Sequence, residues 1–473
     1  MSTSREPVGV IGTGYVGLVS AAGFAELGSD VWCVDIDETK VARLRAGEAP
    51  IYEPGLEQLL ERNAGRLHFS TELAGALEHA RLLFVAVGTP PTHSGDADLS
   101  AVHAVVDAIP AAEDRALVMK STVPCGTGAT LQRVFAEHGK GALSYVSCPE
   151  FLKEGSAIKD FLEPDRVVVG DDGGWAGDAV VELYAPLGAP LVRTDVASAE
   201  MVKLASNAFL ATKISFINEI ANVCEGTGAD VVEVARGMGL DERIGSKFLQ
   251  AGIGFGGSCF PKDVDALKQL AGNSGYHFQL LTSVIEVNEL QKRRVIGKLQ
   301  KHLGSLARKR IALLGLAFKP ETDDMREASS LVLSARLNAD GAIVSAYDPV
   351  AEEQARRLVS GITFADSALA AVEGADAVVL VTEWKEFLEL DFSRVAEAMA
   401  GNLLIDGRNA LDPRRILEAG LLYEGVGRGS LAAHGVGAGV AGTRGGAAGT
   451  RGGAGEASAG AGEQAGARTV EAG

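Results

Sequence analysis

The 473-residue sequence predicts an α/β protein with two doubly wound domains, a long central helical segment between them and a disordered C-terminal tail. The domains are predicted by residues 1 to about 195 and about 310 to 430, which each alternate short β-branched runs with helical stretches. Strands separated by helices form βαβ units and a parallel sheet. The central helix is predicted by residues 198–228, which contain no proline and no glycine before Gly226.

In the first domain the expected strands are VGVIGTG, DVWCVDID, LLFVAVGTP, ALVMKSTVP, LSYVSCPE and RVVVGD. The first strand runs into Gly12-x-Gly14-x-x-Gly17, and an apolar helix follows it. These glycines allow a tight turn, close approach of a pyrophosphate and packing of the helix on the strand. Asp35 ends the next strand, where a carboxylate binds ribose hydroxyls and repels a 2′-phosphate. The pattern predicts a Rossmann-like domain that binds NAD rather than NADP.

The central segment predicts a helix with Ser198 as its N-cap and glycines at its other end. It is apolar around most of its circumference, which suits a domain junction or a dimer seam. Lys203 and Asn207 are four residues apart and share one face. Donors on a buried face need partners, and a substrate oxyanion is one candidate.

The stretch GFGGSCFPKD places Cys259 after three glycines and before a Pro-Lys-Asp turn. The glycines would let backbone N–H groups approach a ligand, while Lys262 and Asp263 would favour the thiolate and orient a proton acceptor. A small core side chain or an idle surface thiol is the alternative for this cysteine. Glu150 and Glu154 follow one strand of the first domain and Thr122 ends another, at the edge where parallel sheets bind ligands.

The second domain is expected to use RIALLGLAFK, IVSAYDP, AVVLVTEW and NLLIDGRN as strands. The Gly/Ala-rich text that follows holds too little apolar surface to offset the entropy of ordering. The expected segments are 1–195, 196–300 with the cysteine loop, 301–428, and the disordered tail 429–473.

The composition excludes several classes of protein. A net charge of −18 argues against a nucleic-acid partner, since phosphate neutralisation needs basic patches. The five scattered cysteines lack CxxC spacing, which predicts a reducing compartment and neither a disulfide framework nor a metal site. No signal-peptide pattern and no run of about 18 apolar residues is present, so we expect a cytoplasmic protein without a membrane partner.

Over residues 7–428 the chain resembles the UDP-glucose 6-dehydrogenases of the UDP-glucose/GDP-mannose dehydrogenase family. The resemblance rests on ordered motifs: GTGYVG, VGTPP, KSTVP, PEFLKEGSA, KLASNAF, RIGSKFLQAGIGFGGSCFPKD, GLAFKPETDDMRE and DGRN. It implies two Rossmann-like domains joined by a long helix that builds a homodimer. It also implies NAD-dependent four-electron oxidation of UDP-glucose to UDP-glucuronate through a cysteine thiohemiacetal and thioester.

The resemblance implies a role for each catalytic candidate. Cys259 is the expected nucleophile, and Lys203 and Asn207 are the expected oxyanion stabilisers. Asp263 is expected to help activate water or thiol. Glu150 and Thr122 manage a proton and an ordered water, and Lys203 acting through water is a rival to Glu150 as first base.

The binding positions are also carried over by resemblance. For NAD they are Gly12, Thr13, Gly14, Tyr15, Val16, Gly17, Asp35, Lys40, Thr89, Thr122, Glu154, Lys262 and Arg326. For the sugar nucleotide they are Glu150, Phe151, Leu152, Lys153, Lys203, Asn207, Arg243, Phe248, Leu249, Gly256, Phe318, Lys319 and Arg408. Arg243 is expected to reach across the dimer. Lys40 departs from the arginine of many relatives, and it keeps the charge but loses bidentate geometry.

Three alternatives stay open. The same chemistry could act on GDP-mannose, although FLEPDRVVVG and IGSKFLQAGIGFGG favour UDP-glucose. A two-electron hydroxyacid dehydrogenase would need the glycine motif, a lysine and an asparagine but no cysteine. A non-catalytic NAD-binding regulator would show gaps among the catalytic candidates, and the sequence has none.

Overall fold

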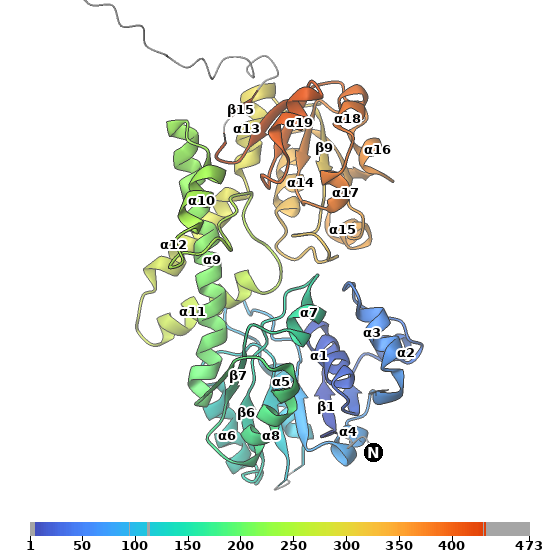
Figure 1. The fold of residues 1–473 in the computed structure, drawn as a ribbon, viewed down its shortest axis with the longest axis vertical. Coiled ribbons are helices and arrows are strands. Elements are labelled where there is room, and N and C mark those ends of the chain that lie inside the picture. Colours follow the sequence, from blue (N-terminus) through green and yellow to red (C-terminus); the bar gives the residue numbers. More distant parts are fainter. Residues whose placement is uncertain (1–4, 94, 111–113, 429, 432–473) are drawn as a thin grey trace, which may run out of the picture. The chain divides into compact units, whose positions relative to one another are not determined.

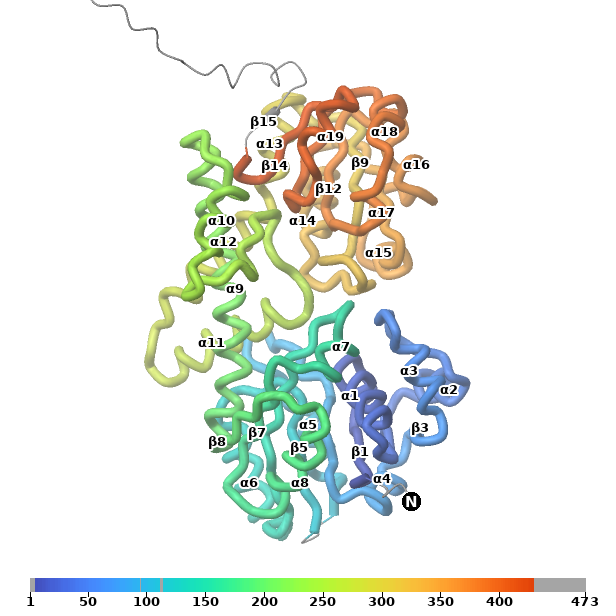
Figure 2. Tube along the Cα trace, in the orientation of Figure 1, coloured from blue at the N-terminus to red at the C-terminus, as the bar shows by residue number. Residues whose placement is uncertain are grey.

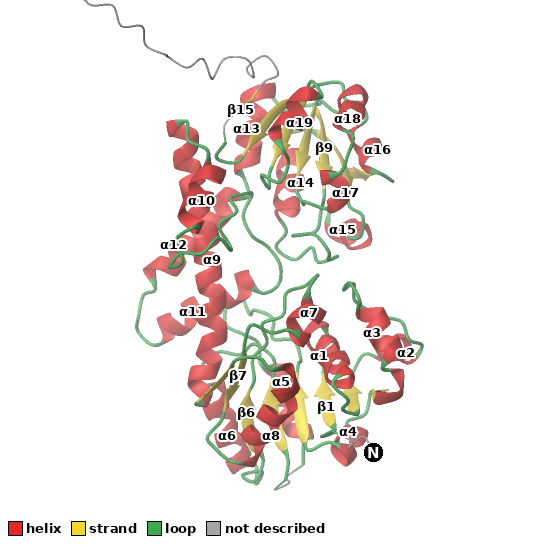
Figure 3. Cartoon of the chain, in the orientation of Figure 1, coloured by secondary structure: helices red, strands yellow, loops and turns green. Residues whose placement is uncertain are grey.

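The computed structural model describes residues 5–93, 95–110, 114–428 and 430–431 (Figure 1). The predicted tail therefore lies outside the described residues, except for Ser430 and Leu431. Within the described part, helices and strands alternate in two stretches of the chain, separated by a helical stretch (Figure 3). This arrangement confirms the predicted α/β class.

The first domain is built on an eight-stranded sheet with the order β3-β2-β1-β4-β5-β6-β7-β8. Its strands are β1 (Val8–Ile11), β2 (Val31–Val34), β3 (Leu67–Ser70), β4 (Leu82–Val85), β5 (Ala116–Met119), β6 (Ser144–Ser147), β7 (Val167–Gly170) and β8 (Leu191–Thr194). The sequence analysis missed β3 and β8. Strand order reverses at β1, between β2 and β4, and ligands bind beside such a switch point in doubly wound sheets.

One strand pair departs from the predicted parallel sheet. β6 and β7 pair antiparallel, with Ser147 opposite Gly170, while the neighbouring pairs are parallel. The chain between them does not cross the sheet. It turns back at the carboxyl edge, so residues 148–166, including Glu150, stay where ligands bind.

Helices cover both faces of this sheet because successive residues of buried strands point to opposite sides. In β4, Leu82 and Phe84 pack with α1, α3, α7 and α8, whereas Leu83 and Val85 pack with α4, α5 and α6. The helices of this domain are α1 (Tyr15–Glu26), α2 (Glu38–Arg45), α3 (Leu56–Arg62), η1 (Ala64–Arg66), α4 (Ala74–His79), α5 (Ser100–Ala108), α6 (Thr127–Glu137), α7 (Ala157–Leu162), α8 (Trp175–Tyr184) and η2 (Ala185–Leu187).

The predicted central helix is α9 (Val196–Thr227), and it begins two residues before the predicted N-cap. Asp195 is the actual N-cap, because its carboxylate accepts from the Ser198 N–H at 2.9 Å. Val196 packs in the core of the first domain, whereas Ile217 and Ala221 pack in the core of the second. The helices that follow are α10 (Val231–Gly239), α11 (Phe260–Asn273), α12 (Gln279–Gln291) and α13 (Arg294–Leu303) (Figure 2).

The second domain has a seven-stranded sheet with the order β11-β10-β9-β12-β13-β14-β15. Its strands are β9 (Arg310–Leu314), β10 (Ile343–Tyr347), β11 (Ile362–Phe364), β12 (Ala377–Leu380), β13 (Leu403–Asp406), β14 (Leu422–Gly425) and β15 (Ser430–Leu431). Its helices are α14 (Ser329–Ala339), α15 (Glu352–Leu358), α16 (Ala368–Val372), α17 (Lys385–Leu388), α18 (Phe392–Ala398) and α19 (Pro413–Glu418).

Two segment ends differ from the sequence prediction. The expected end at residue 300 falls inside α13, whose Val295 and Leu299 pack in the core of the second domain. The expected tail start at 429 is also too early, because Ser430 pairs antiparallel with Glu424 of β14. Sequence composition could not detect either feature, since both depend on contacts with a distant sheet.

All five cysteines are free, and Cys259 is half-buried. Within the described residues, no helix is both long and apolar enough to cross a membrane.

Candidate active site

The glycine motif forms a tight cradle between β1 and α1. Gly12 has φ +95°, and a Cβ at Gly17 would lie 1.8 Å from the Gly12 carbonyl oxygen. Both glycines are therefore required by the turn itself. A Cβ at Gly14 would meet no protein atom within 4 Å, so internal packing does not explain that glycine. The cradle fits a pyrophosphate that approaches the backbone there.

Asp35, at the end of β2, lies beside this cradle. Its Oδ2 accepts from the N–H and the hydroxyl of Thr13, both at 2.8 Å, and pairs with Lys40 Nζ at 3.0 Å. Burial alone would raise the pKa of Asp35, but these hydrogen bonds and that of Asp37 outweigh it and lower the pKa. The carboxylate is thus held ionised next to the glycines, as binding of ribose hydroxyls requires.

β4 and β5 follow β1 in the sheet, and the loops after these two strands bring Thr89 and Thr122 together. The Thr89 hydroxyl donates to the Thr122 carbonyl oxygen at 2.8 Å, which joins the loops after β4 and β5. Both loops lie at the carboxyl edge beside the cradle. The structure thus places these two predicted NAD contacts on the same side as Gly12.

A buried cluster of charged and amide groups lies where α9 meets the loop after β6. Lys203 Nζ is 2.8 Å from Glu150 Oε1, and Asn207 Nδ2 donates to Asp263 Oδ2 at 2.6 Å. All four side chains are buried. Lys203 and Asn207 lie one helical turn apart, so a single face of α9 holds both carboxylates. The structure brings together the residues that the sequence placed far apart.

Cys259 occupies the N-cap position of α11, and the predicted Pro-Lys-Asp turn is in fact the first turn of that helix. Burial raises the pKa of the Cys259 thiol, and the charges of Glu150 and Asp263 raise it further, while Lys203 lowers it. Lys262, which was predicted to favour the thiolate, pairs its ammonium with Asp263 at 2.7 Å.

Lys203 is the cation of this cluster. Burial would lower the pKa of Lys203, but the negative charges of Glu150 and Asp263 outweigh it and raise the pKa. The side chain therefore stays an ammonium. Such a fixed charge in a dry site stabilises negative charge that develops beside it.

The glycines before Cys259 pack against protein. A Cβ at Gly256 would lie 2.3 Å from the Glu327 carbonyl oxygen, and one at Gly257 would lie 2.8 Å from the Phe318 ring. The prediction attributed these glycines to a ligand, but contact with the second domain explains them. Asn288 of α12 also holds this loop, since it accepts from Phe255 N at 2.8 Å and donates to Phe255 O at 3.0 Å. The sequence analysis missed it, and its only signal was a buried amide on a helix.

Arg408 connects the second domain to the cysteine loop. Its guanidinium donates to the carbonyls of Val381, Gly254 and Phe318 at 2.7, 3.2 and 2.8 Å. Lys319, next to Phe318, is half-buried, and burial lowers its pKa although the charges of Glu154 and Cys259 oppose that effect. Three predicted substrate contacts of the second domain thus lie against the cysteine loop.

Glu154 and Arg326 form the contact between the loop after β6 and the second domain. Arg326 Nη2 is 3.6 Å from Glu154 Oε1, and the Thr322 hydroxyl is 3.4 Å from Glu154 Oε2. Burial and the nearby charge of Asp324 raise the pKa of Glu154 to about 7, against the pull of Arg326 and Lys319. This carboxyl therefore titrates in the physiological range.

Glu154→Gln is expected to change how stability depends on pH. A carboxyl whose pKa is raised by folding binds its proton more tightly in the folded state, so stability falls as pH rises from 4.5 through 7. The wild type should lose about 1–3 kcal/mol relative to the variant between pH 5 and pH 8. Urea unfolding of both proteins across that range measures the difference. A constant difference would contradict the raised pKa.

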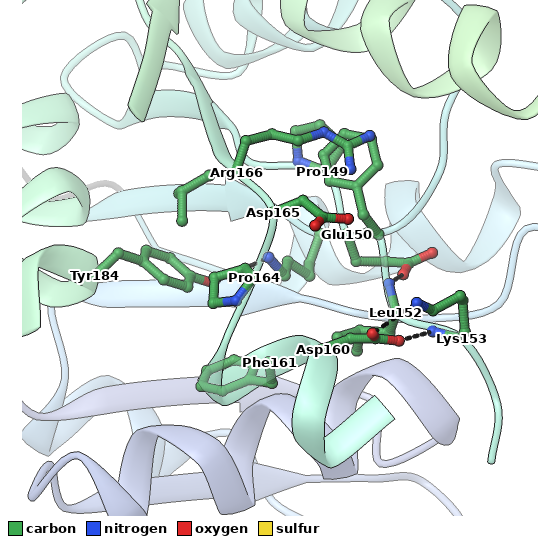
Figure 4. A pocket seen from close by; sticks show the side chains of 13 residues that line it. Pro149, Glu150, Leu152, Lys153, Asp160, Phe161, Pro164, Asp165, Arg166 and Tyr184 are labelled. Atoms are coloured by element: carbon green, nitrogen blue, oxygen red, sulfur yellow. Dashed lines mark hydrogen bonds and ion pairs between the residues drawn. The ribbon is translucent and has the colours of Figure 1, made fainter. Parts of the chain in front are cut away.

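The Phe151 ring lies close to two cations. The Arg166 guanidinium lies 3.6 Å from its ring centroid and Lys203 Nζ lies 5.5 Å from it. The sequence analysis missed Arg166, although it lies in the quoted stretch FLEPDRVVVG. Arg166, Glu150 and Tyr184 line a cavity of about 50 Å³ (Figure 4). That volume holds one or a few waters, and Cys259 does not line it.

The other residues predicted to bind the sugar nucleotide lie in several different environments. Phe248 has φ +64° and its ring centroid is 6.2 Å from that of Phe260, beside Cys259. Leu249 is buried in the second-domain core. Lys153 is exposed and pairs with Asp160 at 2.8 Å. Arg243 is 89% exposed and pairs with Asp241.

Comparison with known proteins identifies the family of this chain. Three family profiles match in order: the NAD binding domain of the UDP-glucose/GDP-mannose dehydrogenase family at 6–188, its central domain at 197–290, and its UDP binding domain at 312–413. The chain belongs to this family. Its central-domain match contains Lys203, Asn207, Cys259 and Asp263.

Individual members of the family are similar over most of the chain. A UDP-glucose 6-dehydrogenase of Pseudomonas aeruginosa is 48% identical over 438 residues, which cover 89% of this chain and 97% of that one. A UDP-glucose 6-dehydrogenase of Bacillus subtilis is 46% identical over 428 residues, covering 89% and 93%. The structure of a UDP-glucose dehydrogenase from Pyrobaculum islandicum matches with a TM-score of 0.83 and 39% identity, covering 90% and 99%.

Proposed function

We propose that this member of the family is an NAD-dependent UDP-glucose 6-dehydrogenase that oxidises UDP-glucose to UDP-glucuronate. The observation that carries the proposal is the buried cluster in which Lys203 and Asn207 hold Glu150 and Asp263 near the thiol of Cys259. A two-electron dehydrogenase has no need of a cysteine there. Relatives named UDP-glucose 6-dehydrogenase support the substrate.

The glycine cradle, Asp35 with Lys40, and the threonine pair would hold NAD, with Glu154, Lys262 and Arg326 completing the contacts. Bound NAD supplies the hydride acceptor for two successive oxidations at one carbon. The Asp35 carboxylate selects NAD over a cofactor with a 2′-phosphate.

In the proposed mechanism Glu150 manages the proton of the C6 hydroxyl, with Thr122 holding a water. Lys203 and Asn207 stabilise the alkoxide, because the raised pKa of Lys203 keeps it charged. Cys259 adds to the aldehyde and holds it as a thiohemiacetal, and after the second oxidation as a thioester. Asp263 orients the water that hydrolyses the thioester and releases the acid.

The proposed sugar-nucleotide site lies between the buried cluster and the second domain. Lys319 and Arg408 supply positive charge near Cys259, and Phe318 packs against the cysteine loop. Positive groups suit a diphosphate. We propose that segment 1–195 binds NAD, that segment 196–300 forms the catalytic and dimer core, and that segment 301–428 binds the uridine nucleotide. Helix α13, which spans residue 300, packs with the second domain.

Counting NADH per limiting UDP-glucose tests this function, with GDP-mannose measured beside it. We expect two NADH for each UDP-glucose and little from GDP-mannose. One NADH would indicate an ordinary alcohol dehydrogenase and remove Cys259 from the mechanism. Turnover with GDP-mannose only would keep the mechanism and change the substrate.

We also propose that the protein is a homodimer with Arg243 reaching into the partner's site. The support is a row of exposed apolar side chains on α9, Phe209, Phe216 and Val223, which are 65%, 49% and 60% exposed. They repeat every seven residues and so follow nearly one face of the helix. Exposed apolar stripes of this kind mark protein–protein contacts.

Phe216→Glu is expected to convert the dimer to monomers, because it places a charge in an apolar contact. Light scattering of the wild type and the variant at equal concentration gives the mass of each. Glu57→Gln, at an exposed position of α3 outside this stripe, is the control and should stay dimeric. A monomeric wild type, or a dimeric Phe216→Glu variant, would contradict the proposal.

A further inference from the structure

Glu53 is a buried carboxylate that no sequence motif indicated. It lies in the segment between α2 and α3 and is only 6% exposed. A buried carboxylate is costly unless hydrogen bonds satisfy it. The hydrogen-bond donors around Glu53 therefore indicate which segments this carboxylate holds together.

Three donors from two functional segments satisfy this carboxylate. Oε2 accepts from the Tyr15 hydroxyl and from Gly155 N at 2.6 Å, and Oε1 accepts from Ala157 N at 2.7 Å. Tyr15 is the first residue of α1 and directly follows Gly14 of the cradle. Gly155 directly follows Glu154. One carboxylate thus ties the glycine cradle to the loop that carries the candidate acids.

The loop is also confined on the opposite side. Gly155 has φ +81°, and a Cβ there would lie 2.9 Å from both Cβ and the carbonyl oxygen of Glu321. The Tyr52 hydroxyl is 3.5 Å from Glu321 Oε2. The backbone at Gly155 is thus held between Glu53 and the second domain, and small changes at Glu53 reach Glu154 directly.

Tyr15 contributes a stable donor. Burial raises its pKa, and the hydrogen bond and charge of Glu53 raise it further, so the phenol stays protonated. The Tyr15–Glu53 contact therefore persists through the physiological range of pH.

We propose that Glu53 is a positioning residue for the cofactor site: it sets the distance between the glycine cradle and Glu154. This inference rests on the proposed function only in that the cradle binds NAD. A change at Glu53 is expected to alter the binding of NAD, because the three donors belong to the cradle and to the Glu154 end of the loop. Lys203, Asn207 and Cys259 are held by other partners.

Glu53→Gln tests the inference, since the amide keeps the size but turns an NH₂ group toward one of the backbone donors. We expect NAD to bind about tenfold more weakly, as for the loss of one hydrogen bond to a charged group. UDP-glucose should bind within about twofold of wild type. Calorimetry with each ligand alone measures both affinities without turnover.

Two further variants keep the test decisive. Tyr15→Phe removes one donor and leaves Glu53 bonded to the two backbone groups, so it should weaken NAD by about threefold even if Glu53→Gln fails to fold. Glu57→Gln changes an exposed acid on α3 and should bind both ligands as the wild type does.

Unchanged NAD affinity in Glu53→Gln, or in Tyr15→Phe where the former does not fold, would overturn the inference. Equal weakening of NAD and UDP-glucose together with a lower Tm would also overturn it, because that pattern indicates a general brace. A wild type that binds NAD but produces no NADH from UDP-glucose would reject the proposed function. The positioning role would then still be decided by the NAD affinities.

Discussion

Cys259→Ser is expected to lower steady-state NADH formation from UDP-glucose by about 10³-fold or more, because a neutral hydroxyl is a far weaker nucleophile than a thiolate. In the structure this side chain begins α11 and lies near the Lys203 ammonium. Burial and two carboxylates raise the pKa of the thiol, so the site holds it neutral at rest and Lys203 opposes that effect. A serine hydroxyl, with a much higher pKa, gains too little from the same charge.

The serine variant should still bind NAD and UDP-glucose, since both proposed binding regions lie mainly on other residues. Rapid mixing with excess NAD should show at most about one NADH per active site before the reaction stalls. Cys125→Ser is the control, because Cys125 is also half-buried but bonds to the Ala197 carbonyl and not to the catalytic candidates, and it should turn over normally. Normal steady-state NADH formation by Cys259→Ser would rule out the covalent mechanism.

Lys203→Met is expected to lower kcat/KM by about 10³-fold, the loss that follows removal of an oxyanion-stabilising group. The ammonium is the positive charge that faces Glu150, Asp263 and Cys259 together. Without it Glu150 is a buried carboxylate that has lost its ion pair, and the pKa of Cys259 rises further. Breaking such a pair should also lower the free energy of unfolding by about 3–5 kcal/mol.

The double variant Lys203→Met/Glu150→Gln separates the two effects. Removing both charges leaves no unpaired carboxylate, so much of the stability should return while activity stays low. Urea unfolding and initial rates of both variants provide the comparison, with Lys159→Met on an exposed position of α7 as the control. Recovery of activity in the double variant would show that Lys203 acts only through stability.

The features that sequence predicted best are those encoded by neighbouring residues. Gly12 and Gly17 follow a strand and precede a helix, and both prove necessary for the turn. The long helix was predicted from its lack of helix breakers, and only its N-cap shifted, from Ser198 to Asp195. Lys203 and Asn207 were placed on one face because helical spacing fixes that relation.

The features that sequence missed depend on contacts across the fold. Glu53 carries no motif, and its importance comes from donors about 38 and 102 residues away. The antiparallel β6–β7 pair was missed because nothing in RVVVGD distinguishes a strand that runs back from one that runs forward. The glycines before Cys259 were predicted to face a ligand, yet Glu327 and Phe318 of the second domain require them.

By itself, the sequence determined the α/β class, the glycine cradle with its acidic partner, the central helix and the identities of the candidate catalytic groups. Local spacing and periodicity suffice for the first three because they relate residues within one turn, strand or helix, whereas the roles of the catalytic candidates come from the resemblance. Only the tertiary structure decided that Lys203 pairs with Glu150, that Asn207 holds Asp263, and that Glu154 meets Arg326. Those distances and the pKa shifts that follow from them arise when segments remote in sequence are buried together, where a few ångströms decide which charges are paired.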